Sequence, residues 1–525
     1  MKAVTHVIAL ALKSLAVAIP FLFAYTQSPL TNFWPLVASA LCGGLIVLLS
    51  IARMGQPAAL REDLGRSLAF GLLLAGTLAS VVGLIQFFKG DVGLSPWIYQ
   101  STVGQAIGNV RQRNQQATLL LMAALALLLC VSRWLGGARE RGVDAPTRAN
   151  TWVTVFAVAA PWLLALLCMG SGVTASRTGA VEWMALVIML WFWRKSMGRL
   201  ALGLAVAGLF AYLLAAWALP ELLLRWTGVQ VDGLFMRVAD TSHRCTSRFT
   251  LWSNMAHLIG LQPWTGWGWG ELDFAHYSTV FPGERFCVLL DNAHNLPLHL
   301  AVELGLPVAM AFCALVLWVL WRAKPWRETD AARQLAWGVL ALIAMHSMLE
   351  FPLWYGPFQL VAVLSIVILL LPVRAVEIAA QETMRWQVAA LLACVAWLAG
   401  IHLVTSDFRR MAALYQSPPY RAAQWRELTP REVSENSDFF TDQAEFAWLT
   451  TTSLTPGNAA QMHAMARRML HYSPEPRVIT KLIESARILG VEVEVQEQMK
   501  LFQIAYPDAF KAFVAKQPLP AASAH

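Results

Sequence analysis

Charged residues are scarce in this 525-residue chain, where Asp, Glu, Lys and Arg together make up 14% of the sequence, against about 25% in a soluble globular domain. Hydrophobic residues make up 57%, and they recur in runs of about 20 residues, the length that crosses a bilayer as a helix. This composition predicts an all-α polytopic membrane protein. The net charge of +8 lies mostly in loops expected to be cytoplasmic, so it does not argue for binding nucleic acid.

Further absences narrow the class of protein. No small-x-small cleavage site follows the first apolar run, at about 7–23, so we expect a retained first helix rather than a removed signal peptide. The sequence lacks an H-x-x-x-H pair, a cysteine cluster and an acidic triad, which predicts that neither a metal nor another cofactor is used. It also lacks the internal repeats that many transporters carry.

The apolar runs predict eleven transmembrane helices. Basic residues are dense in alternate loops, and the positive-inside rule makes those loops cytoplasmic, with the N-terminus inside and the C-terminus outside. The outer side then holds a long loop of about 220–303 and several shorter loops. The predicted spans are 5–24, 35–52, 67–88, 115–132, 151–170, 180–193, 200–219, 304–321, 335–350, 359–373 and 386–404.

Composition changes sharply after about residue 406. We predict a transmembrane domain over 1–406, with the outer loop of about 220–303 included. Residues 407–525 are polar, with helical periodicity punctuated by prolines and a glycine. This pattern predicts a small α-helical domain outside the membrane, with a repeat-like stack of helix pairs as one possible arrangement.

The seven cysteines fall into two groups. Five lie in predicted spans and are expected to pack as small apolar side chains. Cys245 and Cys287 both lie in the long outer loop. In an oxidising compartment they are the candidate pair, so we predict a disulfide, with two buried thiols as the alternative.

One polar cluster enters the fourth predicted span. Arg111 and Arg113 run against the positive-inside trend on the outer side, and Gln115 follows at hydrocarbon depth. Polar groups at that depth usually face an interior cavity. The alternative is a polar loop that ends in a helix cap.

Arginines also mark two other outer loops. Arg177 lies in a very short loop among small, hydroxylated residues, which suits an anion site better than an arginine that snorkels to headgroups. Arg248 lies in the long loop, followed by Trp252 and the alternating Gly and Trp residues of 263–270. Arginine recognises phosphate oxygens through two parallel hydrogen bonds, and the glycines predict a tight turn rather than a strand.

Two histidine-containing segments complete the polar set. A histidine can exchange a proton near neutral pH, and His294 is flanked by Asp291 and Asn295 just before an apolar run. We therefore take it as the first candidate for acid–base chemistry, against the alternative of a structural histidine. His346 and Glu350 share a helix face near the outer end of another span. A packing hydrogen bond is as good an explanation of that pair as catalysis.

Together these residues resemble a bacterial superfamily that comprises O-antigen ligases, O-antigen polymerases and PglL-type protein O-oligosaccharyltransferases. His294 and Asn295, followed by Gly305, are similar to the ligase pattern, from which Val308 departs at the terminal position. Ser176-Arg177-Thr178-Gly179 resembles the short-loop arginine motif of the family.

The resemblance extends over most of the chain. Arg248, Trp252 and the Gly266-Trp-Gly268 turn are similar to the large-loop signature. The outer helical tail and three segments resemble the oligosaccharyltransferase branch in particular. Those segments are 109–115, 291–306 and 350–358.

The resemblance implies a GT-C-like membrane glycosyltransferase of the bacterial inner membrane. It would transfer a glycan from an undecaprenyl-pyrophosphate donor to a hydroxyl in the periplasm without a metal ion. His294 would be the general base, and Arg177 and Arg248, supported by Arg111 and Arg113, would offset the charge of the pyrophosphate. The residues expected to support catalysis or position the acceptor are Gln115, Asn295, Asp291, Tyr355, His346 and Glu350.

The acceptor stays open at this point. A serine or threonine of a pilin-like or other periplasmic protein is the first hypothesis, the lipid A–core oligosaccharide the second, and another glycan unit the third. A transporter or flippase of lipid-linked sugars is the alternative from a different class. Against that alternative, the polar groups gather on one side of the membrane rather than near its midplane.

Overall fold

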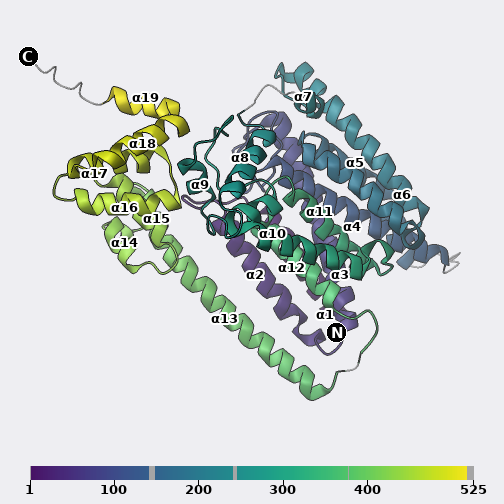
Figure 1. The fold of residues 1–525 in the computed structure, drawn as a ribbon. Helices are drawn as coiled ribbons and strands as arrows, with labels where there is room; N and C mark the ends of the chain where they lie inside the picture. Colours follow the sequence, from purple (N-terminus) through teal and green to yellow (C-terminus); the bar gives the residue numbers. More distant parts are fainter. Residues whose placement is uncertain (1, 141–147, 240–244, 377, 517–525) are drawn as a thin grey trace, which may run out of the picture. The chain divides into compact units, whose positions relative to one another are not determined.

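The computed structural model describes residues 2–140, 148–239, 245–376 and 378–516, and every long regular element in this part of the chain is a helix. The predicted all-α class is confirmed (Figure 1). The helices of the first half are α1 (Lys2–Leu22), α2 (Phe33–Ser50), α3 (Pro57–Lys89), α4 (Arg113–Glu140), α5 (Arg148–Gly172), α6 (Arg177–Thr227), α7 (Leu234–Ala239) and α8 (Arg248–Leu261). Those of the second half are α9 (Leu272–Ser278), α10 (Leu296–Ala323), α11 (Ala331–Ser347), α12 (Gly356–Leu370), α13 (Ala380–Ala412), α14 (Pro430–Asn436), α15 (Thr441–Thr451), α16 (Ala459–Tyr472), α17 (Pro476–Leu489), α18 (Glu492–Ala505) and α19 (Pro507–Ala515).

Eight of the described helices are long and apolar enough to cross a membrane, namely α1 to α6, α10 and α13. The 51 residues of α6 include a non-helical kink at Gly198, where φ is 83° and ψ is 161°, so two helices meet there and correspond to the predicted spans 180–193 and 200–219. The shorter helices α11 and α12 overlap two further predicted spans. The chain is therefore a multi-pass membrane protein, while the side on which each loop lies stays a prediction.

The chain forms two compact units. Unit 1 comprises Met1–Asp240 and Val319–His402, and unit 2 comprises Thr241–Trp318 and Leu403–His525. The division passes through α10 and α13, so the long loop groups with the tail. The domain boundary predicted at 406/407 stays a prediction.

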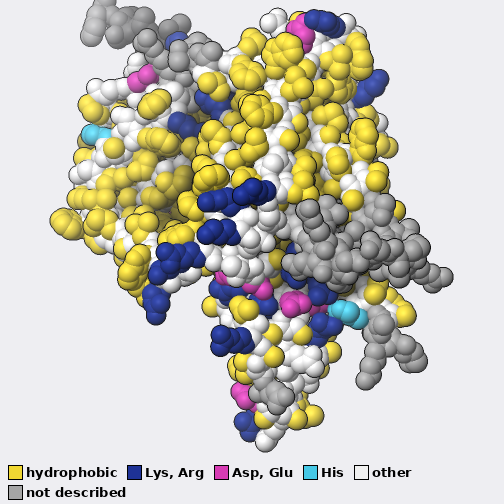
Figure 2. All heavy atoms as spheres, turned by 90° about the vertical axis from the view of Figure 1, so that its right-hand side faces the viewer, with side chains coloured by type: hydrophobic (Ala, Val, Ile, Leu, Met, Phe, Trp, Pro, Cys, Tyr) yellow, Lys and Arg dark blue, Asp and Glu magenta, His cyan; other side chains and the backbone are white. Residues whose placement is uncertain are grey.

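Helix α4 is the central helix of unit 1. Between Leu119 and Val131 every residue is apolar and buried, and a helix that is apolar on all sides belongs in the interior. It packs against α3, α5, α6 and α11. In α13, by contrast, none of the apolar stretch is buried, as expected for a lipid-facing helix. Figure 2 shows a face of the molecule on which hydrophobic side chains predominate.

Two ion pairs join helices of unit 1. The ammonium group of Lys13 on α1 contacts the carboxylate of Asp63 on α3, and both side chains are buried. Arg61 on α3 lies 3.1 Å from Asp330, the N-cap of α11. A buried charge without a partner costs several kcal/mol, on the order of 3–5. These pairs therefore fasten α1 and α11 to α3.

Unit 2 has its own apolar core. Consecutive tail helices from α14 to α19 pack against one another, with Met465, Ile479, Leu482 and Phe502 among the buried residues. Tyr277 of α9 belongs to the same cluster. The loop that carries α8 and α9 is thus packed together with the tail rather than separate from it.

Candidate functional site

Two buried amide side chains shape the loop between α3 and α4 in unit 1. Gln86 accepts the backbone N–H of Gly108 through Oε1 at 2.7 Å and donates to the Tyr99 carbonyl at 2.9 Å. Asn109 donates to the Trp97 carbonyl at 2.9 Å. Burying an amide without partners is costly, so these bonds hold the loop in one conformation. They fix the backbone from which the two predicted arginines extend.

Arg111 lies beside Gln115 and Tyr355. Its backbone is left-handed, with φ 63°, and its guanidinium donates to the Thr31 carbonyl at 2.9 Å and to the side chain of Asn32. Burial lowers the pKa of Arg111. With Gln115 and Tyr355 it lines a narrow cleft of about 10 Å³, space for roughly one water molecule. The buried Oε1 of Gln115 has no hydrogen-bond partner among the described residues, so it is open to a ligand donor.

A polar network links three elements of unit 1. Asn114 donates to Glu350 at 3.1 Å and accepts a hydrogen bond from the Ser176 hydroxyl at 2.7 Å. One turn further along α4, the Thr118 hydroxyl lies 2.8 Å from Nδ1 of His346. The structure therefore connects both His346 and Glu350 to α4, and through Asn114 to the turn that precedes Arg177.

Glu182 belongs to this network and was not predicted. It is fully buried on α6 and accepts a hydrogen bond from Thr118 at 2.7 Å. The sequence places Glu182 inside an apolar run. Its position there could have identified it as a candidate, because charged groups within membrane spans are costly and often functional.

The same local structure presents both Arg177 and Arg248. Each is the first residue of a helix and follows a serine N-cap, which is Ser176 for α6 and Ser247 for α8. The positive end of a helix dipole favours a bound anion at such a position. Arg177 is exposed and forms no hydrogen bond or ion pair with the residues that the structure describes, so its guanidinium is available to a ligand.

Arg113 lines a different pocket from Arg111, although only one residue separates them. This pocket measures about 290 Å³, and Asp232 and Arg237 also line it. Arg237 donates to the carbonyl of Ala175 at 2.9 Å. Sequence reasoning did not single out Asp232 and gave Arg237 no role, because nothing local indicated that they would lie beside α4.

In unit 2, His294 immediately precedes the capped start of α10. Its backbone N–H donates to the Asn292 side chain at 2.8 Å, and its φ is 50°, a left-handed conformation uncommon outside glycine. Asn295 accepts the N–H of Leu298 at 3.0 Å. Asp291 is exposed, while Asn292 and Asn295 are buried. These bonds fix the position of the His294 backbone.

The glycine- and tryptophan-rich segment forms the predicted tight turn and docks on a kink in α10. Helix α10 bends at Gly305, where φ is 84°. Around the bend, Leu306 donates to the Pro263 carbonyl at 2.8 Å, and Gly268 donates to the Glu303 carbonyl at 3.0 Å. The turn thus supplies hydrogen-bond partners for backbone groups of α10 that have no partner within the bent helix.

Two glycines make this docking possible. A Cβ on Gly305 would overlap the carbonyl of Trp264, and one on Gly266 would overlap the carbonyl of Glu303. The backbones therefore approach more closely than any other residue allows. The rings of Trp264 and Trp269 remain 76% and 69% exposed, so they are available to lipid or sugar.

The remainder of the long loop is cross-linked. Cys245 and Cys287 form a disulfide, with their Cα atoms 5.4 Å apart. Asn254 on α8 accepts the N–H of Phe286 at 2.8 Å. The segment between α9 and α10 is thereby fastened to the start of α8, where Arg248 lies.

Two buried titratable groups near this segment escaped prediction. Burial raises the pKa of Asp273 to about 7, opposed by a hydrogen bond from the Phe274 N–H, and the charges of Glu271 and Asp291 raise it further. Burial, together with the charge of Arg285, lowers the pKa of His276 to about 3. The sequence shows both residues but carries no signal of their burial.

The predicted site residues fall in two sets. Unit 1 holds Arg111, Arg113, Gln115, Arg177, His346, Glu350 and Tyr355, and unit 2 holds Arg248, Asp291, His294 and Asn295. Among the residues that the structure describes, no three His, Cys, Asp or Glu side chains are grouped so that they could hold a metal ion. The catalytic and binding roles of all these residues stay predictions.

The helices and their buried polar networks define a multi-pass α-helical membrane protein with polar sites at helix ends. Three family models match the chain. The one described as "Protein glycosylation ligase" matches residues 106–129, the one described as "O-Antigen ligase" matches 159–313, and the one described as "Virulence factor membrane-bound polymerase, C-terminal" matches 334–519. Over these three segments the chain is similar to O-antigen ligases, membrane-bound polymerases and protein glycosylation ligases.

A relative from Acinetobacter baylyi (strain ATCC 33305 / BD413 / ADP1) is named "General O-oligosaccharyltransferase". It is 22% identical over 334 residues, which cover 62% of this chain and 54% of the relative. The chain thus spans about half the length of the curated relative that it matches. The family resemblance seen in the sequence is confirmed.

Proposed function

We propose that this protein transfers a preassembled oligosaccharide from undecaprenyl-pyrophosphate to serine or threonine hydroxyls of periplasmic proteins, pilin-like proteins included, at the bacterial inner membrane. The observation that carries the proposal is the exposed guanidinium of Arg177 at the start of a capped helix, which no described residue pairs with. The match of 106–129 to the protein glycosylation ligase model and the name of the Acinetobacter relative support a protein acceptor.

The leaving group is a lipid pyrophosphate with several negative charges. We assign Arg177 and Arg248 to offset that charge, because each combines a guanidinium with a helix N-terminus. Fixed donors of this kind stabilise charge that develops in the transition state without the cost of reorganising water. Arg111, whose guanidinium is held by Thr31 and Asn32, would act with Gln115 and Tyr355 in positioning the substrate.

His294 is our general base. The acceptor oxygen would attack the anomeric carbon while its proton passes to the imidazole, and the bond from that carbon to the pyrophosphate oxygen would break. Displacement from the opposite side gives inversion at the anomeric carbon. The hydrogen bonds of Asn292 and Asn295 to the adjacent backbone support this role, since a base must be held in place.

A second candidate is the joining of one glycan unit to another. It is favoured by the match of 334–519 to the model described as a membrane-bound polymerase. In that case the attacking hydroxyl would belong to a sugar, and the same base and arginines would serve.

Acceptor competition tests the proposal. Purified protein is supplied with a lipid-linked oligosaccharide and offered a pilin-like protein, lipid A–core and additional lipid-linked glycan in parallel. We expect mass spectrometry to find the glycan on serine or threonine of the protein. Elongated glycan alone would support the second candidate, and glycan on lipid A–core alone would contradict both.

A further inference from the structure

We propose that the pocket lined by Arg113 and Arg237 binds the phosphate group of a lipid at the membrane interface. This site is separate from Arg177, whose guanidinium does not line the pocket. The proposal goes beyond glycan transfer and does not depend on it, because its test measures binding.

The pocket is a built feature of unit 1. Its walls come from the loop before α4, the turn between α5 and α6, and the segment around α7. Gly104, with φ 86°, donates to the Phe87 carbonyl at 2.8 Å, and a Cβ there would overlap Val231. A Cβ on Gly172 would lie 2.8 Å from the Cβ of Ala215. Glycine at both positions lets the three segments close around the cavity.

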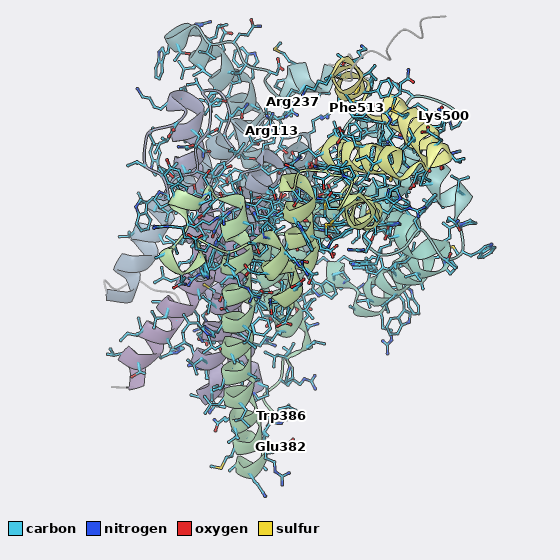
Figure 3. The ribbon with its side chains drawn as sticks, turned by 90° about the vertical axis from the view of Figure 1, so that its left-hand side faces the viewer. Arg113, Arg237, Glu382, Trp386, Lys500 and Phe513 are labelled. Atoms are coloured by element: carbon cyan, nitrogen blue, oxygen red, sulfur yellow. A yellow bond between two sulfur atoms is a disulfide. The ribbon has the colours of Figure 1, made fainter. Side chains whose placement is uncertain are left out.

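The charge of the pocket suits a phosphate. Arg113 and Arg237 contribute two guanidinium groups, against one carboxylate from Asp232. Figure 3 labels both arginines, which lie in the same part of unit 1. Arg237 is held by its bond to the Ala175 carbonyl, so part of the cost of ordering it is already met in the free protein. Guanidinium groups match phosphate oxygens in charge and geometry.

The surroundings favour a lipid as the source of that phosphate. Trp226, at the end of α6, is 72% exposed, and its ring lies 5.8 Å from that of Phe88. Tryptophan gathers at membrane–water interfaces, which is the level of lipid headgroups. Phe87, Pro220 and Val231 give the same pocket an apolar wall, which suits the carbon atoms next to a headgroup. The volume of about 290 Å³ fits a headgroup rather than a whole oligosaccharide.

Lipid titration of charge variants tests this site. Delipidated protein in detergent is titrated with phosphatidylglycerol, with a polyprenyl pyrophosphate and with inorganic phosphate, and thermal stabilisation is followed. We expect Arg113→Gln and Arg237→Gln each to weaken lipid binding by about tenfold, the effect of losing one charged hydrogen bond. Asp232→Asn should strengthen it, because it removes the competing carboxylate. The lipid that responds identifies the source of the phosphate.

Arg225→Gln is the matched control. Arg225 lies on α6, is exposed and pairs with Glu221 at 3.0 Å. The substitution therefore removes one positive charge, as the pocket variants do, without changing a residue that lines the pocket. Lipid binding by this variant should be unchanged. Equal binding by this control and both pocket variants would overturn the proposal, as would a response to inorganic phosphate alone. If the arginine variants fail to fold, Asp232→Asn still decides, since unchanged affinity in that variant contradicts the site.

Discussion

At the scale of single residues, Asp273 is a group whose burial the surrounding sequence does not indicate. It is an acid in the first turn of the short helix α9, yet it is buried, with a pKa of about 7. The nearby His276 is buried as a neutral ring with a pKa of about 3. Both shifts have the same cause, since burial disfavours the charged form of either group. They affect stability in opposite directions with pH.

Asp273→Asn should therefore stabilise unit 2 above pH 7. The folded protein keeps the proton of Asp273 up to about pH 7, whereas the unfolded chain releases it near the ordinary aspartate pKa of 3.8. This contribution to stability is full below about pH 4 and is lost as the pH rises to about 7. Asparagine can still accept the Phe274 N–H and stays neutral, so melting curves at pH 8 should show a gain on the order of 2 kcal/mol.

At pH 4 the wild type and Asp273→Asn should melt alike. The contribution of His276 has the opposite sign: it grows as the pH rises from about 3 to 6.5 and is the same in both proteins. A gain that did not vary with pH would contradict the titration of Asp273.

At the scale of elements, the bend in α10 depends on its contact with the turn at 263–270. Gly305→Ala adds a Cβ that overlaps the Trp264 carbonyl, at a position with φ 84°. The alanine must strain the backbone or push the turn away, at a cost of about 1–3 kcal/mol. We expect faster proteolysis of the loop in unit 2 and reduced glycan transfer.

Gly260→Ala is the matched substitution. Gly260 lies in α8 with nothing within 4 Å of an added Cβ, and alanine favours a helix by roughly 0.5–1 kcal/mol. This variant should be as resistant to protease as the wild type or more so. The turn would not be the anchor of α10 if Gly305→Ala resisted protease equally well.

Local patterns were enough to predict most elements of this fold. The spans follow from the length of apolar runs, and the breaks at Pro352 and Pro357 follow from proline geometry. Within α6 the backbone is non-helical at Gly198, so two helices meet there across a kink, and the basic residues from Arg194 to Arg199 marked this break in the sequence.

The site depends on contacts that local patterns do not encode. Gly266 and Gly305 were each noticed, but they meet each other's segments across 38 intervening positions. Arg111 and Arg113 were treated as one group, yet the left-handed backbone at Arg111 directs them to different pockets. Positive φ at a residue other than glycine leaves little trace in a sequence.

At the scale of the whole molecule, the tail contributes directly to the structure of the long loop. Within unit 2, Tyr277 of α9 donates to Gln498 of α18 at 2.8 Å. The ring of Phe274 stacks on His471 of α16, with centroids 3.9 Å apart. These contacts make α9 part of the tail core, so the tail supports the loop in addition to any role in binding acceptors.

Truncation after Ser406 should consequently release α9. Without the tail, Phe274 and Tyr277 lose their apolar surroundings, and the amides of Leu272–Ser278 should exchange with solvent at least about a hundredfold faster. The amides of α4, which packs wholly in unit 1, should keep their protection and serve as the internal control. Unchanged exchange in α9 would show that the loop folds without the tail.

The central claim concerns His294 as the base that activates the acceptor hydroxyl. The most direct measurement is single-turnover glycan transfer from a lipid-linked oligosaccharide to a pilin-like protein by His294→Ala, with His257→Ala on α8 as the control. We predict that the first variant binds the donor normally but loses at least about a hundredfold in rate, while the control transfers at the wild-type rate. Transfer by His294→Ala at the wild-type rate would contradict the account.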